Sequence, residues 1–214
     1  MVQIIPSILA TSEDQYQQDL QKLSSSDSLK MGWVHIDFAD NKFVQNKTVE
    51  PEVIQKFPTN FRKEAHLMVE NPLSWIDQLV RSGFERVIFH LESKDNTDEC
   101  IRKIKEVNLE VGIALKIETP IEKLQPFIAK INTVLVMTIV AGFQGQPFIP
   151  QVLDKVRSIK SENWPVRVGV DGAVNDTDVK QIVESGVDFM IVGSFLLEGD
   201  VDERLERLWK EING

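Results

Sequence analysis

The sequence predicts a single closed (β/α)8 barrel that spans residues 1–214, and three observations lead to it. Eight short apolar runs alternate with longer amphipathic stretches, which is typical of parallel strands joined by right-handed helical crossovers. The apolar runs are rich in Val and Ile and do not alternate strictly, as in strands that are buried on both faces. The length of 214 residues also suits one such domain.

The elements follow in order from these patterns. Between the strands, apolar residues recur at helical spacing, as at Val179, Ile182 and Val183. An open doubly wound sheet is the main alternative, but it requires a glycine-rich G-x-G-x-x-G turn after the first strand, where the chain has Ser7-Ile8-Leu9-Ala10. The predicted strands are residues 3–8, 33–37, 64–68, 86–91, 110–116, 133–138, 166–171 and 189–192.

Composition excludes several classes of partner. The chain has 24 Lys and Arg against 33 Asp and Glu, a net charge of −9, and no basic tract, which argues against nucleic acid and against an anionic membrane surface. Residues 1–6 lack the basic and apolar regions of a signal peptide, and no apolar run approaches the ~18 residues of a membrane span. We therefore expect a cytoplasmic protein. The single Cys100 cannot form an internal disulfide and is interpreted as a helix residue rather than a nucleophile.

All three histidines fall at the ends of consecutive predicted strands, where barrels of this type carry their active sites. His35 and Asp37 are two residues apart, so both face the barrel interior. His66 and Asp171 complete a possible set of two His and two Asp, and these ligands suit zinc, iron(II), manganese or cobalt. A single buried His is more often a satisfied core residue, but three together favour a site. His90 is interpreted as a partner packed against it.

Two further polar residues follow the strand ends. Glu92 is interpreted as a solvated loop carboxylate. Lys116, at the end of the fifth strand, leaves open a Schiff-base or electrostatic lysine.

Glycine-bearing loops follow the last three strands. Glycines permit positive φ, so successive N–H groups can converge on an anion, and barrels frequently bind phosphate in the last two of these loops. A single glycine loop is usually only a turn, but three adjacent ones favour a phosphate site. The residues concerned are Gly142, Phe143, Gln144, Gly145, Gly172, Ala173, Gly193 and Ser194.

Taken together, these motifs resemble the ribulose-phosphate 3-epimerase family and relatives that act on other ketose phosphates. The resemblance covers nearly the whole chain, and its motifs are specific in combination and in order. They include Ile5-Pro6-Ser7-Ile8-Leu9, Val34-His35-Ile36-Asp37, Ala65-His66-Leu67-Met68-Val69, Leu135-Val136-Met137-Thr138, Gly142-Phe143 and Val170-Asp171-Gly172.

The resemblance implies a TIM barrel of the ribulose-phosphate-binding type and a metal-dependent isomerase. One divalent metal, zinc first among the candidates, would be held by His35, Asp37, His66 and Asp171. The two Asp would also transfer protons through an enediolate, converting D-ribulose 5-phosphate to D-xylulose 5-phosphate in the pentose phosphate pathway. A homo-oligomer, dimer or hexamer, is also implied. The implied substrate contacts are Ser7, His66, Met68, Met137, Gly142, Phe143, Gln144, Gly145, Gly172, Ala173, Gly193 and Ser194.

Departures from the family pattern leave the substrate open. Ala39 replaces a Met, Gln144 replaces a Gly, and Asn41 and Ala173 replace two more glycines; none of these changes removes a ligand or a base. A hexulose 6-phosphate epimerase is therefore one alternative. An aldolase or decarboxylase that uses Lys116 is another, although the decarboxylase D-x-K-x-x-D run is not found. A non-catalytic sugar-phosphate binder is a third.

Overall fold

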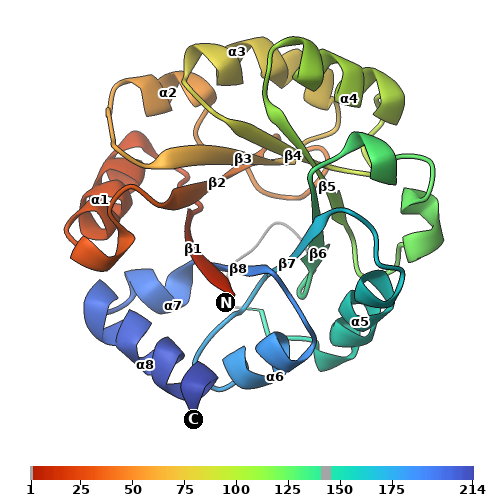
Figure 1. Cartoon of the computed structure of the whole chain (residues 1–214). Helices are drawn as coiled ribbons and strands as arrows, with labels where there is room; N and C mark the ends of the chain where they lie inside the picture. The colour runs from red at the N-terminus through yellow and green to blue at the C-terminus, as the bar shows by residue number, and fades with distance from the viewer. Residues whose placement is uncertain (1, 141–145) are drawn as a thin grey trace.

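The computed structural model describes residues 2–140 and 146–214, and it confirms the predicted barrel. Eight parallel strands pair in sequence order and close on themselves, with helices around the outside (Figure 1). The observed bounds lie within a few residues of the predicted ones. The strands are β1 (Gln3–Ile8), β2 (Trp33–Ala39), β3 (Arg62–Met68), β4 (Arg86–His90), β5 (Glu110–Leu115), β6 (Thr133–Met137), β7 (Arg167–Asp171) and β8 (Phe189–Val192).

The helices form the outer layer and bury one face each against the strands. Side-chain caps begin three of them: Ser12, Asn96 and Asp200 accept hydrogen bonds from backbone N–H groups of the first turns of α1, α4 and α8. The α-helices are α1 (Glu13–Ser24), α2 (Pro51–Gln55), α3 (Ile76–Arg81), α4 (Thr97–Glu106), α5 (Leu153–Ser161), α6 (Val179–Glu184), α7 (Ser194–Leu197) and α8 (Val201–Asn213). The 3-10 turns are η1 (Asp27–Leu29), η2 (Pro72–Trp75), η3 (Ile121–Leu124), η4 (Ile128–Lys130) and η5 (Pro150–Val152).

The crossover from β5 to β6 departs from the regular pattern. It consists of η3 and η4 without an α-helix, while two α-helices, α7 and α8, follow β8. Pro126 lies between η3 and η4 and has no N–H to continue a helix, which accounts for the break.

Two layers of apolar side chains hold the barrel together. The larger layer lies between the strands and the helices, and the smaller one fills the barrel interior. Gly169 on β7 makes room for the interior Phe189, since a Cβ at this position would lie 2.2 Å from the ring. The interior cluster consists of Ile5, Trp33, Ile88, Ala114, Leu135, Phe189 and Ile191.

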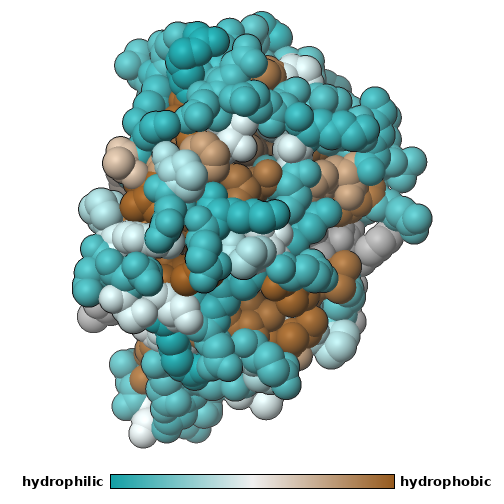
Figure 2. Space-filling view, turned by 90° about the vertical axis from the view of Figure 1, so that its right-hand side faces the viewer, coloured by the Kyte–Doolittle hydropathy of each residue, from teal (hydrophilic) through white to brown (hydrophobic). Residues whose placement is uncertain are grey.

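The outer surface agrees with the charged composition. Figure 2 shows a mostly hydrophilic side of the molecule in which apolar residues gather in separate patches. Within the described ranges, the large apolar residues that are exposed are Met31, Val80 and Val140. Helical spacing predicts Val80 on the buried face of its helix, but its side chain reaches solvent. No helix among the described residues is long and apolar enough to cross a membrane.

Candidate active site

A cavity of about 300 Å³ opens at the carboxyl ends of the strands. The carboxylate-bearing residues Asp37 and Asp171 line it, and so do most of the described residues that the sequence suggested as substrate contacts. His66 is the exception, because it is fully buried beneath the cavity. The expected contacts at Gly142, Phe143, Gln144 and Gly145 lie outside the described residues. Those that line the cavity are Ser7, Met68, Met137, Gly172, Ala173, Gly193 and Ser194.

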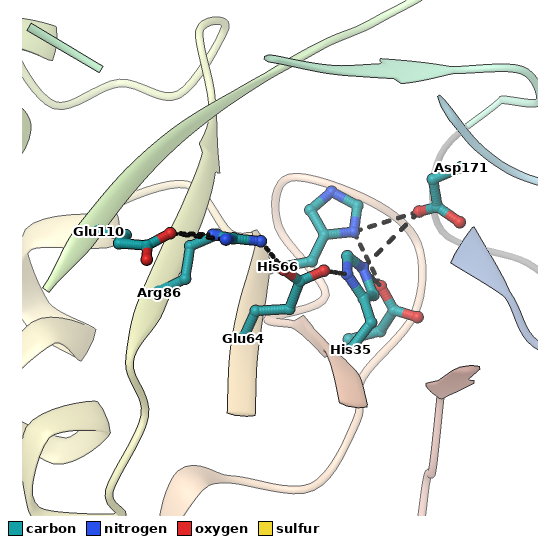
Figure 3. Close-up of polar contacts among 7 residues, drawn as sticks. His35, Glu64, His66, Arg86, Glu110 and Asp171 are labelled. Carbon is teal, nitrogen blue, oxygen red and sulfur yellow. Dashed lines mark hydrogen bonds and ion pairs between the residues drawn. The ribbon is translucent and has the colours of Figure 1, made fainter. Parts of the chain in front are cut away.

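Four side chains meet at the base of this cavity, as the sequence predicted. His35 and Asp37 come from β2, His66 from β3 and Asp171 from β7. Figure 3 shows His35, His66 and Asp171 turned toward one another. His66 Nδ1 lies 2.8 Å from Asp37 Oδ1 and 3.4 Å from Asp171 Oδ2. His35 Nε2 lies 3.4 Å and 3.9 Å from the same two oxygens. One donor atom from each residue falls within 4.8 Å of all the others, so the four can converge on one ion.

A further observation supports a divalent metal at these four side chains. His35 Nε2 is fully buried, and no described residue forms a hydrogen bond with it. A buried polar atom without a partner is costly, and it calls for an explanation such as an ion. Imidazole nitrogens and carboxylate oxygens together suit zinc and its neighbours in the first transition series.

Glu64 and Arg86 support His35 from below, a feature that we did not predict from the sequence. Glu64 Oε1 lies 2.7 Å from His35 Nδ1, and Arg86 donates to Glu64 Oε2 at 2.6 Å. Burial opposes the charge on Glu64, but the contacts with His35 and Arg86 outweigh it and lower the pKa of Glu64. Glu64 lies two residues before His66, so the period of a strand already placed it inside the barrel.

The third histidine packs against the site, as expected, but Glu92 was interpreted wrongly. His90 Nε2 lies 3.0 Å from His66 Nε2. Glu92 is not a solvated carboxylate: its side chain is 21% exposed, it contacts His90 Nδ1 at 3.3 Å, and it accepts hydrogen bonds from Thr119 Oγ1 and the Lys116 N–H. Burial opposes its ionisation, yet the bonds from His90 and Thr119 lower the pKa of Glu92 to about 2. Burial lowers the pKa of His90 to about 4.

The two cavity carboxylates differ in their affinity for a proton. Burial, and then the negative charge of Asp37, raise the pKa of Asp171 to about 6. Burial acts on Asp37 in the same direction, but the charge of His35, the hydrogen bond from His66 and the charge of His66 outweigh it and hold the pKa of Asp37 below its ordinary value. Two carboxylates with separated proton affinities are characteristic of acid–base sites.

The far end of the cavity is formed by backbone-rich turns after β7 and β8. Gly172 has a φ of +122°, and a Cβ there would lie 2.5 Å from the Ile139 side chain, so this position requires glycine. Ala173 adopts a φ of +54°, at a position where the resemblance led us to expect glycine. Gly193 has a φ of −98°, so the positive φ that glycine permits is not used there. Asn41 also takes a left-handed φ of +58°, as expected for a residue that replaces a turn glycine.

Two polar residues that line the cavity were not predicted from the sequence, whereas Lys116 does not line it. Glu198 and Asn175 line the cavity, although nothing in their sequence surroundings marked them. Lys116 is not among the lining residues, and its Nζ lies 3.9 Å from the centre of the Phe43 ring.

Fold and site together define the class of protein: a (β/α)8-barrel enzyme with a buried two-His, two-Asp cluster below a polar cavity at the strand ends. The family model described as "Ribulose-phosphate 3 epimerase family" matches residues 3–197. A ribulose-phosphate 3-epimerase of Mycobacterium tuberculosis (strain ATCC 25618 / H37Rv) is 33% identical, over 92% of this chain and 86% of the relative. One from Schizosaccharomyces pombe is also 33% identical, over 94% and 90%. The chain therefore belongs to the ribulose-phosphate 3-epimerase family, and it is an isomerase.

Solved structures support the fold. A 3-hexulose-6-phosphate synthase from Salmonella typhimurium superposes with a TM-score of 0.73 at 16% identity, covering 99% of both chains. KGPDC from Streptococcus mutans gives a TM-score of 0.73 at 13% identity, covering 100% of this chain and 98% of the other. At such identities the likeness concerns the barrel alone.

Proposed function

We propose that this enzyme inverts carbon 3 of D-ribulose 5-phosphate to give D-xylulose 5-phosphate, and that it depends on a divalent metal. Family membership supports the reaction class. The observation that carries the proposal is the cluster of His35, Asp37, His66 and Asp171, in which both carboxylates also line the cavity.

The metal would be held by these four residues. When bound, it would supply Lewis-acid stabilisation of the negative charge that develops on the substrate oxygens. Zinc is our first candidate, while iron(II), manganese and cobalt accept the same ligands.

Asp37 and Asp171 would transfer the protons. Inversion requires that one group remove the carbon-3 proton from one face and that another deliver a proton to the opposite face. The two residues come from β2 and β7, which are separated by β1 and β8 in the closed ring, so their carboxylates approach the cavity from different sides. Both side chains line the cavity and are only 7% and 14% exposed, so each carboxylate can reach a substrate bound there directly.

The phosphate would bind at the turns after β7 and β8. Gly172, Ala173, Gly193 and Ser194 line this end of the cavity, and no Lys or Arg does so among the described residues. Backbone N–H groups and the Ser194 hydroxyl are then the donors available for an anion in this part of the site. Binding energy at the phosphate would orient carbon 3 between the two carboxylates.

The same proposal includes a homo-oligomer, either a dimer or a hexamer, and a cytoplasmic location. A relative from Oryza sativa subsp. japonica that is 32% identical is named a cytoplasmic isoform. Light scattering on the purified chain tests the oligomer, and localisation of a tagged chain tests the compartment.

Exchange of the carbon-3 proton with solvent deuterium tests the reaction. Metal-loaded protein should exchange this proton of ribulose 5-phosphate and form xylulose 5-phosphate, and a chelator should stop the exchange until metal is restored. A hexulose 6-phosphate run in parallel tests the alternative substrate. If metal-loaded wild type exchanges no ketose phosphate, the proposed function is wrong.

A further inference from the structure

A row of polar and charged side chains begins at His35, a member of the candidate metal cluster, and crosses the barrel interior away from the cavity. Strand register pairs His35 with Glu64, Glu64 with Arg86, and Arg86 with Glu110, so four neighbouring strands each contribute one member. Direct register partners face the same side of a sheet, which here is the interior. We call these four residues the charged row (Figure 3).

The row is continuous and largely removed from water. The side chains of His35 and Glu64 are 0% exposed and that of Arg86 is 3% exposed, whereas Glu110 at the far end is 38% exposed. Each oxygen of Glu64 has one partner: Oε1 lies 2.7 Å from His35 Nδ1, and Oε2 accepts from Arg86 at 2.6 Å. Arg86 also donates to Glu110 Oε2 at 2.8 Å and 2.6 Å, so its guanidinium is anchored on both sides.

The charges along the row determine which ring nitrogen of His35 carries a proton. Arginine remains a cation in proteins, and a buried carboxylate beside it remains an anion. An ionised carboxylate can only accept hydrogen bonds, so His35 Nδ1 must donate to Glu64. In neutral His35 the free lone pair is then on Nε2, the nitrogen that faces Asp37 and Asp171.

We propose that Glu64 and Arg86 are positioning residues that fix His35 in its Nδ1–H tautomer and present Nε2 to the metal. The inference rests on the metal site of the proposed function and adds the residues that prepare one of its ligands. Carboxylate partners of this kind orient a metal-binding imidazole and make it a stronger base.

The second histidine is held differently, which gives the proposal a specific signature. His66 turns Nδ1 toward Asp37 and Asp171, and its Nε2 faces His90 at 3.0 Å. The two histidines should therefore use different nitrogens, His35 its Nε2 and His66 its Nδ1. A row that served only as a buried ion pair would impose no such difference.

The wild-type chain provides the first test. Long-range proton–nitrogen NMR of the imidazole rings, with and without Zn²⁺, reports which nitrogen bears a proton and which shifts with the metal. We expect His35 to keep a protonated Nδ1 in the metal-loaded state while Nε2 shifts. Metal binding through His35 Nδ1 would overturn the proposal, and this test requires no variant to fold.

Zinc affinity in variants provides the second test. Glu64→Gln keeps the shape of the side chain but removes its charge, and it should weaken Zn²⁺ binding about 10- to 100-fold in competition with a chromophoric chelator. Glu106→Gln is the matched control, because the exposed Glu106 side chain also pairs with an arginine, Arg102, at 2.6 Å, and both residues lie on α4. The zinc affinity of this control should stay within about twofold of wild type, as for a surface change.

The possible outcomes distinguish a failure of the proposed metal site from a failure of the positioning role. If wild type binds no Zn²⁺ at the cluster, the metal site of the proposed function is wrong and the positioning role falls with it. If wild type binds Zn²⁺ and Glu64→Gln binds it equally well, the metal site stands and the positioning role alone is refuted.

Discussion

Replacing Gly169 by alanine should destabilise the barrel from within. An added Cβ would lie 2.2 Å from two atoms of the Phe189 ring, whereas ordinary contacts are 3.4–4 Å. Gly169 and Phe189 are direct register partners on β7 and β8, and Phe189 is fully buried in the interior cluster. The ring therefore has little room to retreat. Overpacking of this kind typically costs about 1–3 kcal/mol.

The corresponding change in Tm follows from the size of the chain. For 150–250 residues, 1 kcal/mol is about 2–4 °C, so Gly169→Ala should lower the Tm by about 2–12 °C. Differential scanning calorimetry measures the change. Gly199→Ala is the control, because the atoms nearest to its Cβ would belong to the flexible Arg204 side chain.

A smaller partner should relieve the strain. Gly169→Ala combined with Phe189→Leu should lose less stability than the sum of the two single changes, since the shortened side chain vacates space that the new methyl can occupy. A Gly169→Ala chain as stable as wild type, or strict additivity in the double variant, would refute the packing argument.

Three further predictions concern single side chains. Asp171→Asn should slow carbon-3 proton exchange about 10²- to 10⁴-fold in the deuterium assay, with exposed Asp154→Asn as control; a wild-type rate would contradict the two-base assignment. Burial raises the pKa of Tyr16 above its ordinary value, so the contribution of Tyr16 to stability is complete below pH ~10 and declines as the pH rises further. Tyr16→Phe should therefore lessen the fall in the free energy of unfolding between pH 9 and pH 11, as chemical unfolding measures it. A fall as steep as in wild type would contradict this prediction. Burial, and then the charges of Asp95 and Glu99, raise the pKa of the Cys100 thiol to about 12. Iodoacetamide at pH 8 should therefore label Cys100 about a thousandfold more slowly in the folded protein than in the unfolded protein. Mass spectrometry measures the two labelling rates.

The barrel could be predicted because its evidence is local. Seven of the eight strands contain Val or Ile, and β3 is the exception. Each strand end carries its residues to the same rim of the barrel. The connection between β5 and β6 shows the limit of this reasoning. Its two 3-10 turns lie on either side of Pro126, which has no N–H to continue a helix, and helical spacing in the sequence does not describe such a break.

The candidate site likewise has a part that the sequence predicted and a part that it did not. His35, Asp37, His66 and Asp171 could be placed together because all four lie near the carboxyl ends of strands, at the same rim of the barrel. Glu92 was misjudged because its burial depends on Thr119 and Lys116, which are 27 and 24 residues away and fold over it. No local pattern in the sequence announces such a contact between two loops.

Glu64 and Arg86 lie between these cases. Arg86 is the first residue of β4, and Glu64 is the first buried residue of β3. Buried charges are rarely tolerated unless they are paired. That rule alone suggests that the two pair across adjacent strands. It does not reveal that Glu64 also reaches His35, because a register shift of two residues would keep every side chain inside the barrel and place Arg62 or His66 opposite His35 instead. The register of β2 against β3 is therefore what joins the charged row to the candidate metal centre.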